Sequence, residues 1–474
     1  MKKSDCLAGR FIIFPMLALS SCVGPEGGST AGQRPNIVLI NIDDMGWRDV
    51  GFMGSEYYET PNLDALAARG MVFTHAYASA SNCAPSRACL MSGQWGPRHG
   101  IYTVESSERG RSENRKLIPT VNNTVLPDEL YTLAEALKDA GYVTCHAGKW
   151  HLGPDPLTQG FDINIGGSRA GSPGSYFPPY KNVPLEPPTE DYCLTNLIMD
   201  KVLEFLETTG DRPFFLHYTP YAVHTPIQPV KSLLPKYLEK KPWHGQQNAD
   251  YATMVENLDT QIGRLVNQLE ESGRFRQTVI LFTTDNGGHY GITRQLPLRS
   301  GKGSYYEGGI RVPLFVCWEG RIEAGTRSEV PVTNLDFYPT LLEVAGIPKH
   351  PEKILDGQTF LPVLRGEGTL AERPLFWHFP VYLEAYLKEG DPTQDPLFRT
   401  RPGSAMRLGD WKLIQYFENN DIELYHLAND VGEATNLAGQ NPEKASELLG
   451  ILEAWRTETR APVPTEPNPD FKTR

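Results

Sequence analysis

The run Asn36-Ile37-Val38-Leu39-Ile40-Asn41-Ile42, followed directly by Asp43-Asp44, decides the fold class that this sequence predicts. Its apolar residues fall on both faces of an extended chain, which is typical of a central strand in a parallel sheet. Similar runs recur at residues 142–146, 213–218, 278–283 and 312–318, with helical patterns at 63–70, 132–138 and 249–271. Strands that alternate with helices predict an α/β fold, with a large central sheet that is mixed but mostly parallel and is flanked by helices.

The pattern changes after about Pro374. Residues 404–414 read as two short strands around a Gly-Asp turn, 423–427 as a neighbouring strand, and 442–459 as an amphipathic helix with proline in its first turn. We therefore expect a larger domain over residues 35–373 and a smaller α+β C-terminal subdomain over 374–474. Because of the aromatic and histidine run 376–382 at their boundary, we expect the subdomain to pack against the mouth of the functional site and to narrow it to a chain end.

The N-terminus has the features of an export signal. Two lysines precede the apolar stretch 11–19, which is too short to span a membrane as a stable helix. The following Leu19-Ser20-Ser21-Cys22 resembles a bacterial lipobox, in which Cys22 would carry lipid; ordinary signal cleavage nearby is the alternative. We expect residues 1–22 to be a lipoprotein signal peptide with its lipobox and 23–34 to be a flexible tether. The mature protein would then be an exported bacterial lipoprotein, membrane-anchored in the periplasm or at the cell surface.

Composition limits the partners. The chain has 474 residues and a formal net charge of -12, which argues against a nucleic-acid partner because phosphate binding needs a basic surface. An anionic small substrate stays possible, since a local group of cations can bind an anion on an acidic protein. None of the seven cysteines forms a C-x-x-C pair, so a zinc site is not expected.

Two oxygen-bearing pairs follow predicted strands: Asp43-Asp44 and Asp285-Asn286. In open α/β sheets ligands gather at the carboxyl ends of strands, and adjacent carboxylates repel one another unless a cation holds them. Oxygen ligands without His or Cys favour calcium or magnesium over zinc. The alternative for each pair is an ordinary solvated turn.

A third motif is the run Cys83-Ala84-Pro85-Ser86-Arg87. It resembles the signature of the formylglycine-dependent (type I) sulfatase family in the alkaline phosphatase-like superfamily, where this cysteine becomes 3-oxoalanine (formylglycine) after synthesis. A lone cysteine is usually an inert buried thiol. Further runs match the family in its order, at residues 148–153, 222–226, 301–304, 307–313, 409–413 and 423–425. Taken singly, Lys149 and Lys302 would be solvated charges and His224 a core histidine, but their joint appearance makes those interpretations improbable.

The resemblance implies hydrolysis of sulfate esters. In this family the aldehyde hydrates to a geminal diol, one hydroxyl attacks sulfur, and the second hydroxyl loses its proton as the aldehyde re-forms and sulfate leaves. Carried over by position, one calcium ion would be held by Asp43, Asp44, the group derived from Cys83, Asp285 and Asn286. The catalytic set would be Cys83, Arg87, Lys149, His151, His224 and Lys302. The implied partners are a sulfated saccharide and a formylglycine-generating maturation enzyme.

Two alternatives stay open: a phosphonate or phosphodiester hydrolase of the same superfamily, and a non-catalytic glycan-binding lipoprotein. Aromatic and basic residues near the motifs are candidates for sugar contacts, with packing or solvent exposure as the alternative: Trp95, Arg98, His99, His289 and Arg294.

Overall fold

The computed structural model describes residues 34–388 and 390–473. The predicted signal peptide, the lipobox cysteine Cys22 and nearly all of the tether lie outside the described residues, so the expectations about export and anchoring stay predictions. Residues 34–474 form one compact unit. No helix within the described part of the chain is both long and apolar enough to cross a membrane.

A nine-stranded sheet forms the centre of this unit, in the order β4-β3-β5-β1-β6-β7-β2-β8, with β9 paired to β2. The strands are β1 (Asn36–Ile42), β2 (Met71–Tyr77), β3 (Val143–Gly148), β4 (Ile163–Ile165), β5 (Phe214–Thr219), β6 (Thr278–Thr284), β7 (Arg311–Cys317), β8 (Thr326–Ser328) and β9 (Val332–Thr333). β1 lies in the middle, parallel to β5 and β6, and all its residues are buried. β7 runs antiparallel to β6 and β2. The predicted mixed, mostly parallel sheet is confirmed.

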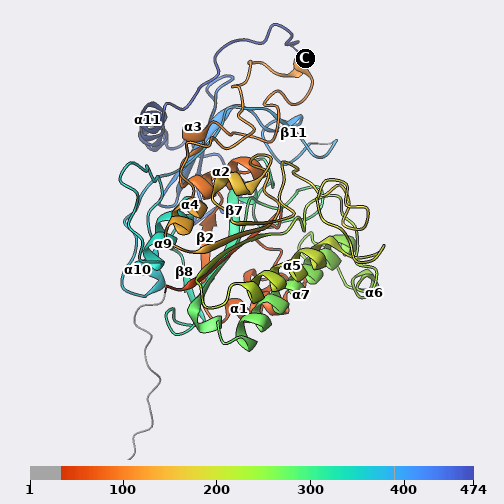
Figure 1. Ribbon diagram of the computed structural model, residues 1–474. Helices are drawn as coiled ribbons and strands as arrows, with labels where there is room; N and C mark the ends of the chain where they lie inside the picture. Colours follow the sequence, from red (N-terminus) through yellow and green to blue (C-terminus); the bar gives the residue numbers. More distant parts are fainter. Residues whose placement is uncertain (1–33, 389, 474) are drawn as a thin grey trace, which may run out of the picture. The chain divides into compact units, whose positions relative to one another are not determined.

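Helices cover both faces of the sheet (Figure 1). One layer holds α1 (Pro61–Ala67), α5 (Leu194–Thr208), α6 (Leu234–Leu238) and α7 (Ala249–Glu271), and the other holds α2 (Cys83–Ser92), α4 (Leu133–Asp139), α9 (Phe337–Val344) and α10 (Leu361–Leu364). Short helices lie in the connections: α3 (Gly96–His99), α8 (Glu307–Ile310) and 3-10 turns at Gly51–Met53, Ser112–Asn114, Pro156–Gln159, Phe275–Gln277 and Asn334–Asp336. α7 has the predicted bounds. α4 begins after Thr132, which forms a capping box with Glu135.

The C-terminal part forms a second, antiparallel sheet in the order β10-β13-β14-β15. It contains β10 (Leu375–Phe379), β13 (Gly403–Leu408), β14 (Trp411–Tyr416) and β15 (Ile422–His426), with α11 (Pro442–Thr459) packed on it and a separate ribbon of β11 (Leu383–Glu384) and β12 (Phe398–Thr400). The predicted strands around the Gly-Asp turn are the β13–β14 hairpin, in which Leu408 pairs with Trp411. The hairpin and α11 confirm the predicted α+β character of this part.

The aromatic run at the start of this part packs inside it and lines no part of the cavity above Cys83, so other residues of the subdomain would have to narrow the mouth of the site. Phe376 stacks on Trp455 of α11 with ring centroids 4.6 Å apart, and buried Trp377 donates a hydrogen bond to the carbonyl of Ala78. The core between β10 and α11 buries these apolar side chains. Because removing apolar surface from water is favourable, they pack there and not along a cavity.

A buried ionic cluster joins the two sheets. Lys412 Nζ on β14 lies 3.0 Å from Glu307 Oε1 on α8 and 2.7 Å from Glu433 Oε1, and all three side chains are fully buried. Glu307 also lies 3.4 Å from Arg311. Buried charges need such partners, so the C-terminal sheet is tied electrostatically to the segment that follows Lys302.

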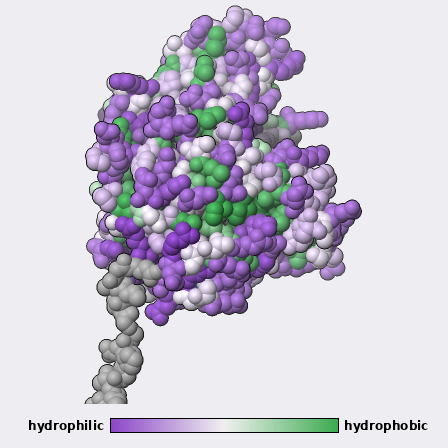
Figure 2. All heavy atoms as spheres, in the orientation of Figure 1, coloured by the Kyte–Doolittle hydropathy of each residue, from purple (hydrophilic) through white to green (hydrophobic). Residues whose placement is uncertain are grey.

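The outside of the molecule is largely polar on the face shown in Figure 2, with hydrophobic residues in smaller areas between hydrophilic ones. Val121 and Leu238, the two most exposed large hydrophobic side chains of the described residues, lie far apart in the sequence. Singly exposed apolar residues of this kind are normal on a soluble surface.

Candidate active site

The predicted site residues converge because their strands end at one edge of the sheet. β1, β3, β5 and β6 are parallel neighbours, so their carboxyl ends lie side by side. Asp43-Asp44 follow β1, Lys149 and His151 follow β3, His224 follows β5, and Asp285-Asn286 follow β6. Cys83 begins α2, which follows β2, and Lys302 lies on the connection from β6 to β7. Every residue of the predicted catalytic and metal sets thus reaches the same edge.

Cys83 lies at the N-terminus of α2. The backbone N–H of Cys83 donates a hydrogen bond to the side chain of Asn82 at 3.1 Å. The thiol is 2% exposed, and its sulfur lies 3.2 Å from Lys302 Nζ. Burial alone would raise the pKa of Cys83, but the charges of Lys149 and Lys302 outweigh it and hold that pKa well below its usual range. This position therefore favours an anion.

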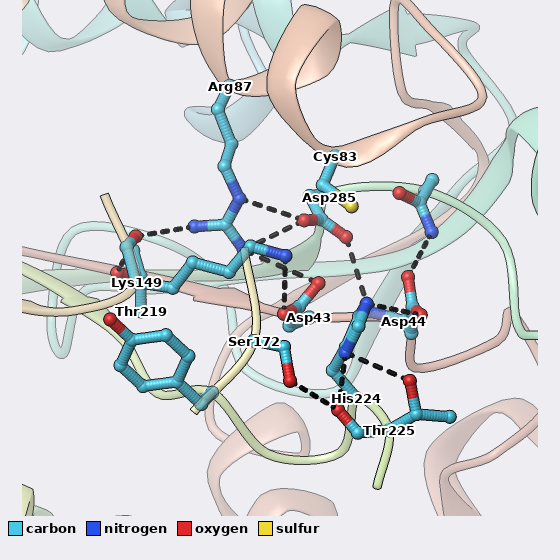
Figure 3. Close-up of polar contacts among 12 residues, drawn as sticks. Asp43, Asp44, Cys83, Arg87, Lys149, Ser172, Thr219, His224, Thr225 and Asp285 are labelled. Atoms are coloured by element: carbon cyan, nitrogen blue, oxygen red, sulfur yellow. Dashed lines mark hydrogen bonds and ion pairs between the residues drawn. The ribbon is translucent and has the colours of Figure 1, made fainter. Parts of the chain in front are cut away.

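Arg87 lies one helical turn after Cys83 and reaches from α2 toward the acidic residues (Figure 3). Its Nη2 and Nε lie 2.7 Å and 2.9 Å from Asp285 Oδ2, and Nη1 donates to the carbonyl of Lys149 at 2.9 Å. The guanidinium is 2% exposed. These contacts fix the orientation of α2 against the ends of β3 and β6.

Two buried lysines hold the first acidic pair. Lys149 Nζ lies 2.7 Å from Asp43 Oδ2, and Lys302 Nζ lies 2.6 Å from Asp44 Oδ1. Asn286 Nδ2 donates to Asp44 Oδ1 at 2.8 Å. Asp44 has a positive φ of 60°, which turns the chain sharply at the end of β1. The two acids and the amide therefore face one another across the sheet edge.

The donor set fits a hard cation. Asp43 Oδ1 and Asn286 Oδ1 are buried oxygens without a hydrogen-bond partner among the described residues, which a metal ion would satisfy. One ligand atom from each of Asp43, Asp44, Cys83 and His224 lies within 4.8 Å of the others. Burial raises the pKa of Asp285 to about 8, since Arg87 only partly offsets burial and the nearby Asp43 carboxylate. Such crowding of buried acids is what a divalent cation relieves.

Two histidines flank this cluster with different surroundings. The Nδ1 of His224 donates to the carbonyl of Thr225 at 2.7 Å, so Nε2 faces Asp44 Oδ2 at 3.6 Å. Burial lowers the pKa of His224, but Asp43 and Asp44 outweigh it and raise the pKa overall. Burial and Lys149 lower the pKa of His151, whose buried Nδ1 has no hydrogen-bond partner among the described residues. The neutral form of His151 is therefore favoured, and it can accept a proton.

A cavity of about 1020 Å³ opens above Cys83. His151, His224 and Lys302 line it, and His289 is the one sugar-contact candidate from the sequence that does so. Four further lining residues have no local signal in the sequence. They are contributed by loops and the β11–β12 region: Arg109, Arg169, Tyr386 and Arg399.

The other sugar-contact candidates are structural. Trp95 packs edge-to-face on Phe376 and Trp455, and Arg98 lies 2.9 Å from Asp356. His99 is buried against Cys89, and Arg294 lies over the ring of Tyr290. None of these four lines the cavity above Cys83.

Comparison with known proteins places the chain in a family. Residues 35–347 match the family model described as Sulfatase, and residues 301–454 match the one described as N-sulphoglucosamine sulphohydrolase, C-terminal. The chain belongs to the sulfatase family. As a sulfatase it is a sulfuric ester hydrolase, and the non-catalytic alternative is set aside.

Similar proteins span nearly the same length. A sulfatase from Formosa agariphila is 33% identical, covering 96% of this chain and 94% of its own. N-acetylgalactosamine-6-sulfatase from Homo sapiens is 32% identical, covering 93% of this sulfatase and 88% of its own chain. The crystal structure of Ps i-CgsB in complex with k-i-k-neocarrahexaose matches with a TM-score of 0.73 at 29% identity, covering 89% and 93% of the two chains.

Proposed function

We propose that this sulfatase hydrolyses sulfate esters of carbohydrates, using formylglycine made from Cys83 and one calcium ion. The observation that supports this most is the position of Cys83, which lies at the base of the cavity between Lys302 and the acidic cluster. An inert structural thiol has no need of two lysines and two histidines around it.

Calcium would be held by Asp43, Asp44, Asp285 and Asn286, whose oxygens are the ligands that this hard cation prefers. A calcium ion here supplies positive charge next to the sulfate and to the group derived from Cys83, while formylglycine supplies a carbonyl that can carry two hydroxyls. The ion would compete with Lys149 and Lys302 for the carboxylates that these lysines contact. With calcium bound, both lysines would be available to contact an anionic substrate.

The remaining residues have separable tasks. Lys149 and Arg87 hold the group at position 83 in place and balance negative charge that develops beside it. His151, neutral and with an unpartnered buried nitrogen, accepts the proton from the second hydroxyl. His224 and Lys302 contact the sulfate and give a proton to the departing sugar oxygen.

A sulfated saccharide is the proposed substrate. Support comes from the name of the human relative, N-acetylgalactosamine-6-sulfatase, and from the oligosaccharide bound in the related crystal structure. A cavity of about 1020 Å³ is large enough for more than one sugar ring. A phosphonate or phosphodiester substrate is the weaker proposal, because these relatives carry sulfatase names.

Maturation is proposed to precede folding. Cys83 is 2% exposed, so a formylglycine-generating enzyme would act on the unfolded chain. We further propose that Cys22 carries lipid and anchors the mature protein to a membrane, with residues 35–373 as the catalytic domain and 374–474 as its subdomain.

The test combines mass spectrometry of the tryptic peptide that contains Cys83 with sulfate release from defined sulfated sugars, and with matched phosphonate esters as a comparison. We expect an aldehyde at position 83 and preferential sulfate release. Full turnover by protein that contains only unmodified cysteine would overturn the mechanism. Faster cleavage of the phosphonate would overturn the substrate class.

A further inference from the structure

Three arginines line the cavity above Cys83 without a role in the proposed reaction: Arg109, Arg169 and Arg399. Arg109 and Arg399 donate to backbone carbonyls, and none of the three forms an ion pair with a carboxylate in the described part of the chain. Lys302, by contrast, is already paired with Asp44. Glu105 is the one acidic side chain that lines this cavity. The wall therefore carries excess positive charge on a chain whose formal net charge is -12.

Arg399 is the most telling of the three because it is 9% exposed and lines the cavity. Its Nη1 donates to the carbonyl of Glu384, but its Nε is buried and lacks a hydrogen-bond partner among the described residues. A guanidinium has five N–H donors and cannot be neutralised by losing a proton. The guanidinium donors that the Glu384 carbonyl does not take are best satisfied by an acceptor in the cavity.

The surroundings of Arg399 hold it in one orientation. Its guanidinium lies 3.7 Å from the ring centroid of Tyr386, and that ring stacks on His289 with centroids 3.6 Å apart. It also lies against Gly303, where an added Cβ would come within 2.3 Å of Arg399 Nε. Because Gly303 follows Lys302, the guanidinium is fixed beside the reacting end of the cavity. A fixed group loses little conformational freedom on binding.

We propose that Arg399, together with Arg169 and Arg109, binds a second anionic group of the substrate that is distinct from the sulfate to be cleaved. The group is a sulfate or a carboxylate on the same or a neighbouring sugar, since both oxyanions accept paired hydrogen bonds from a guanidinium. The inference rests on the proposed function and narrows it, because saccharides with at least two negative groups become the preferred substrates.

Binding to calcium-loaded Cys83→Ala protein tests this without turnover. The probes for calorimetry are N-acetylgalactosamine 6-sulfate, its 4,6-disulfate, and a disaccharide of the 6-sulfate with glucuronate. We expect the disulfate or the glucuronate disaccharide to bind on the order of 10-fold more tightly than the monosulfate, with a gain that shrinks as salt is added. A gain in affinity for the disulfate alone identifies the second group as a sulfate, and a gain for the glucuronate disaccharide alone identifies it as a carboxylate. Equal affinity for all three overturns the inference.

Arginine variants in the same background locate the effect. Arg399→Gln should remove the preference and leave monosulfate affinity unchanged, and Arg169→Gln should reduce the preference without risk to folding because Arg169 is exposed. The matched control is Arg294→Gln, which removes the same charge outside the cavity and should keep the preference. Equal weakening of all probes by Arg399→Gln would assign Arg399 to the cleaved sulfate and refute the inference. Sulfate release by the Cys83 enzyme from the monosulfate is measured separately, so the proposed function succeeds or fails independently.

Discussion

Two nitrogens of Arg87, Nη2 and Nε, lie 2.7 Å and 2.9 Å from one oxygen of Asp285, so a buried two-point contact fastens α2 to the end of β6. Since Cys83 begins α2, this contact positions the proposed nucleophile relative to the acidic cluster. The same guanidinium also donates to the carbonyl of Lys149, which extends the support to β3.

Removing this contact should cost both stability and activity. We expect Arg87→Gln to lower the free energy of unfolding by about 3–5 kcal/mol, because it breaks a buried ion pair and leaves the Asp285 carboxyl and the Lys149 carbonyl without their donor. Arg87→Lys keeps the charge but not the forked guanidinium. Its free energy of unfolding should therefore lie between those of Arg87→Gln and the wild type. Urea unfolding monitored by fluorescence gives these values. An unchanged unfolding midpoint in Arg87→Gln would show that the contact does not support the fold.

Calcium should stabilise the folded protein, since the buried oxygens Asp43 Oδ1 and Asn286 Oδ1 lack a hydrogen-bond partner among the described residues. At a calcium concentration 100 times its dissociation constant the gain is about 2.7 kcal/mol. A chelator should lower the melting temperature and abolish sulfate release, and Asp285→Ala should lower calcium content and turnover together. Elemental analysis measures the content.

The matched control for the metal experiment is Asp49→Asn. Asp49 is a buried acid on the same β1 connection, but its carboxylate accepts hydrogen bonds from Tyr251, Thr293 and Gln295 rather than facing the cluster. This variant should keep its calcium. Loss of calcium from Asp49→Asn but not from Asp285→Ala would place the ion elsewhere.

Acid should destabilise the protein through buried histidines. Burial lowers the pKa of His99 from 6.5 to about 3. Burial also lowers the pKa values of His146 and His378 to about 3. A depressed histidine pKa means that the unfolded chain binds the proton first, so stability is present above pH 6.5 and is lost as the pH falls toward 3. The loss in free energy of unfolding caused by His99→Gln should therefore be about 2 kcal/mol smaller at pH 5 than at pH 7.5. The same cost at both pH values, measured by urea unfolding, would contradict a buried neutral His99.

Trp95 should matter to stability and not to the substrate. It packs on Phe376 and Trp455, so Trp95→Ala should lower the free energy of unfolding by about 3–5 kcal/mol. KM for a sulfated sugar, measured well below the melting temperature, should stay unchanged. A raised KM with unchanged stability would return Trp95 to the sugar site.

Anchoring is tested by fractionating cells that express the full chain. Cys22→Ser should move the protein from the membrane pellet to the soluble fraction, because lipid chains would supply the anchoring free energy. A variant that stays in the pellet would exclude lipidation at Cys22 as the anchor.

The central strands and the motif residues could be predicted because each has a local cause. β1 is an uninterrupted apolar run, and parallel neighbours must place Asp43 and Asp285 at one edge. β2 was missed because the partly exposed Thr74 and His75 interrupt its apolar run where the register shifts.

Sugar contacts could not be predicted from nearness in the sequence. Trp95 lies close to Cys83 along the chain, but α2 separates it from the cavity, since α2 runs from Cys83 to Ser92. Arg399 is far from Cys83 in sequence and reaches the cavity only through tertiary packing over Gly303. No local pattern encodes that approach.

The fully buried contacts of Lys412 with Glu307 and Glu433 bear on how this enzyme can be cut and recombined. A truncation near Pro374 removes Lys412 and leaves Glu307 as a buried anion five residues after Lys302. The C-terminal region is therefore no detachable module, and grafting it from a relative requires that lysine, or an equivalent cation, to travel with it.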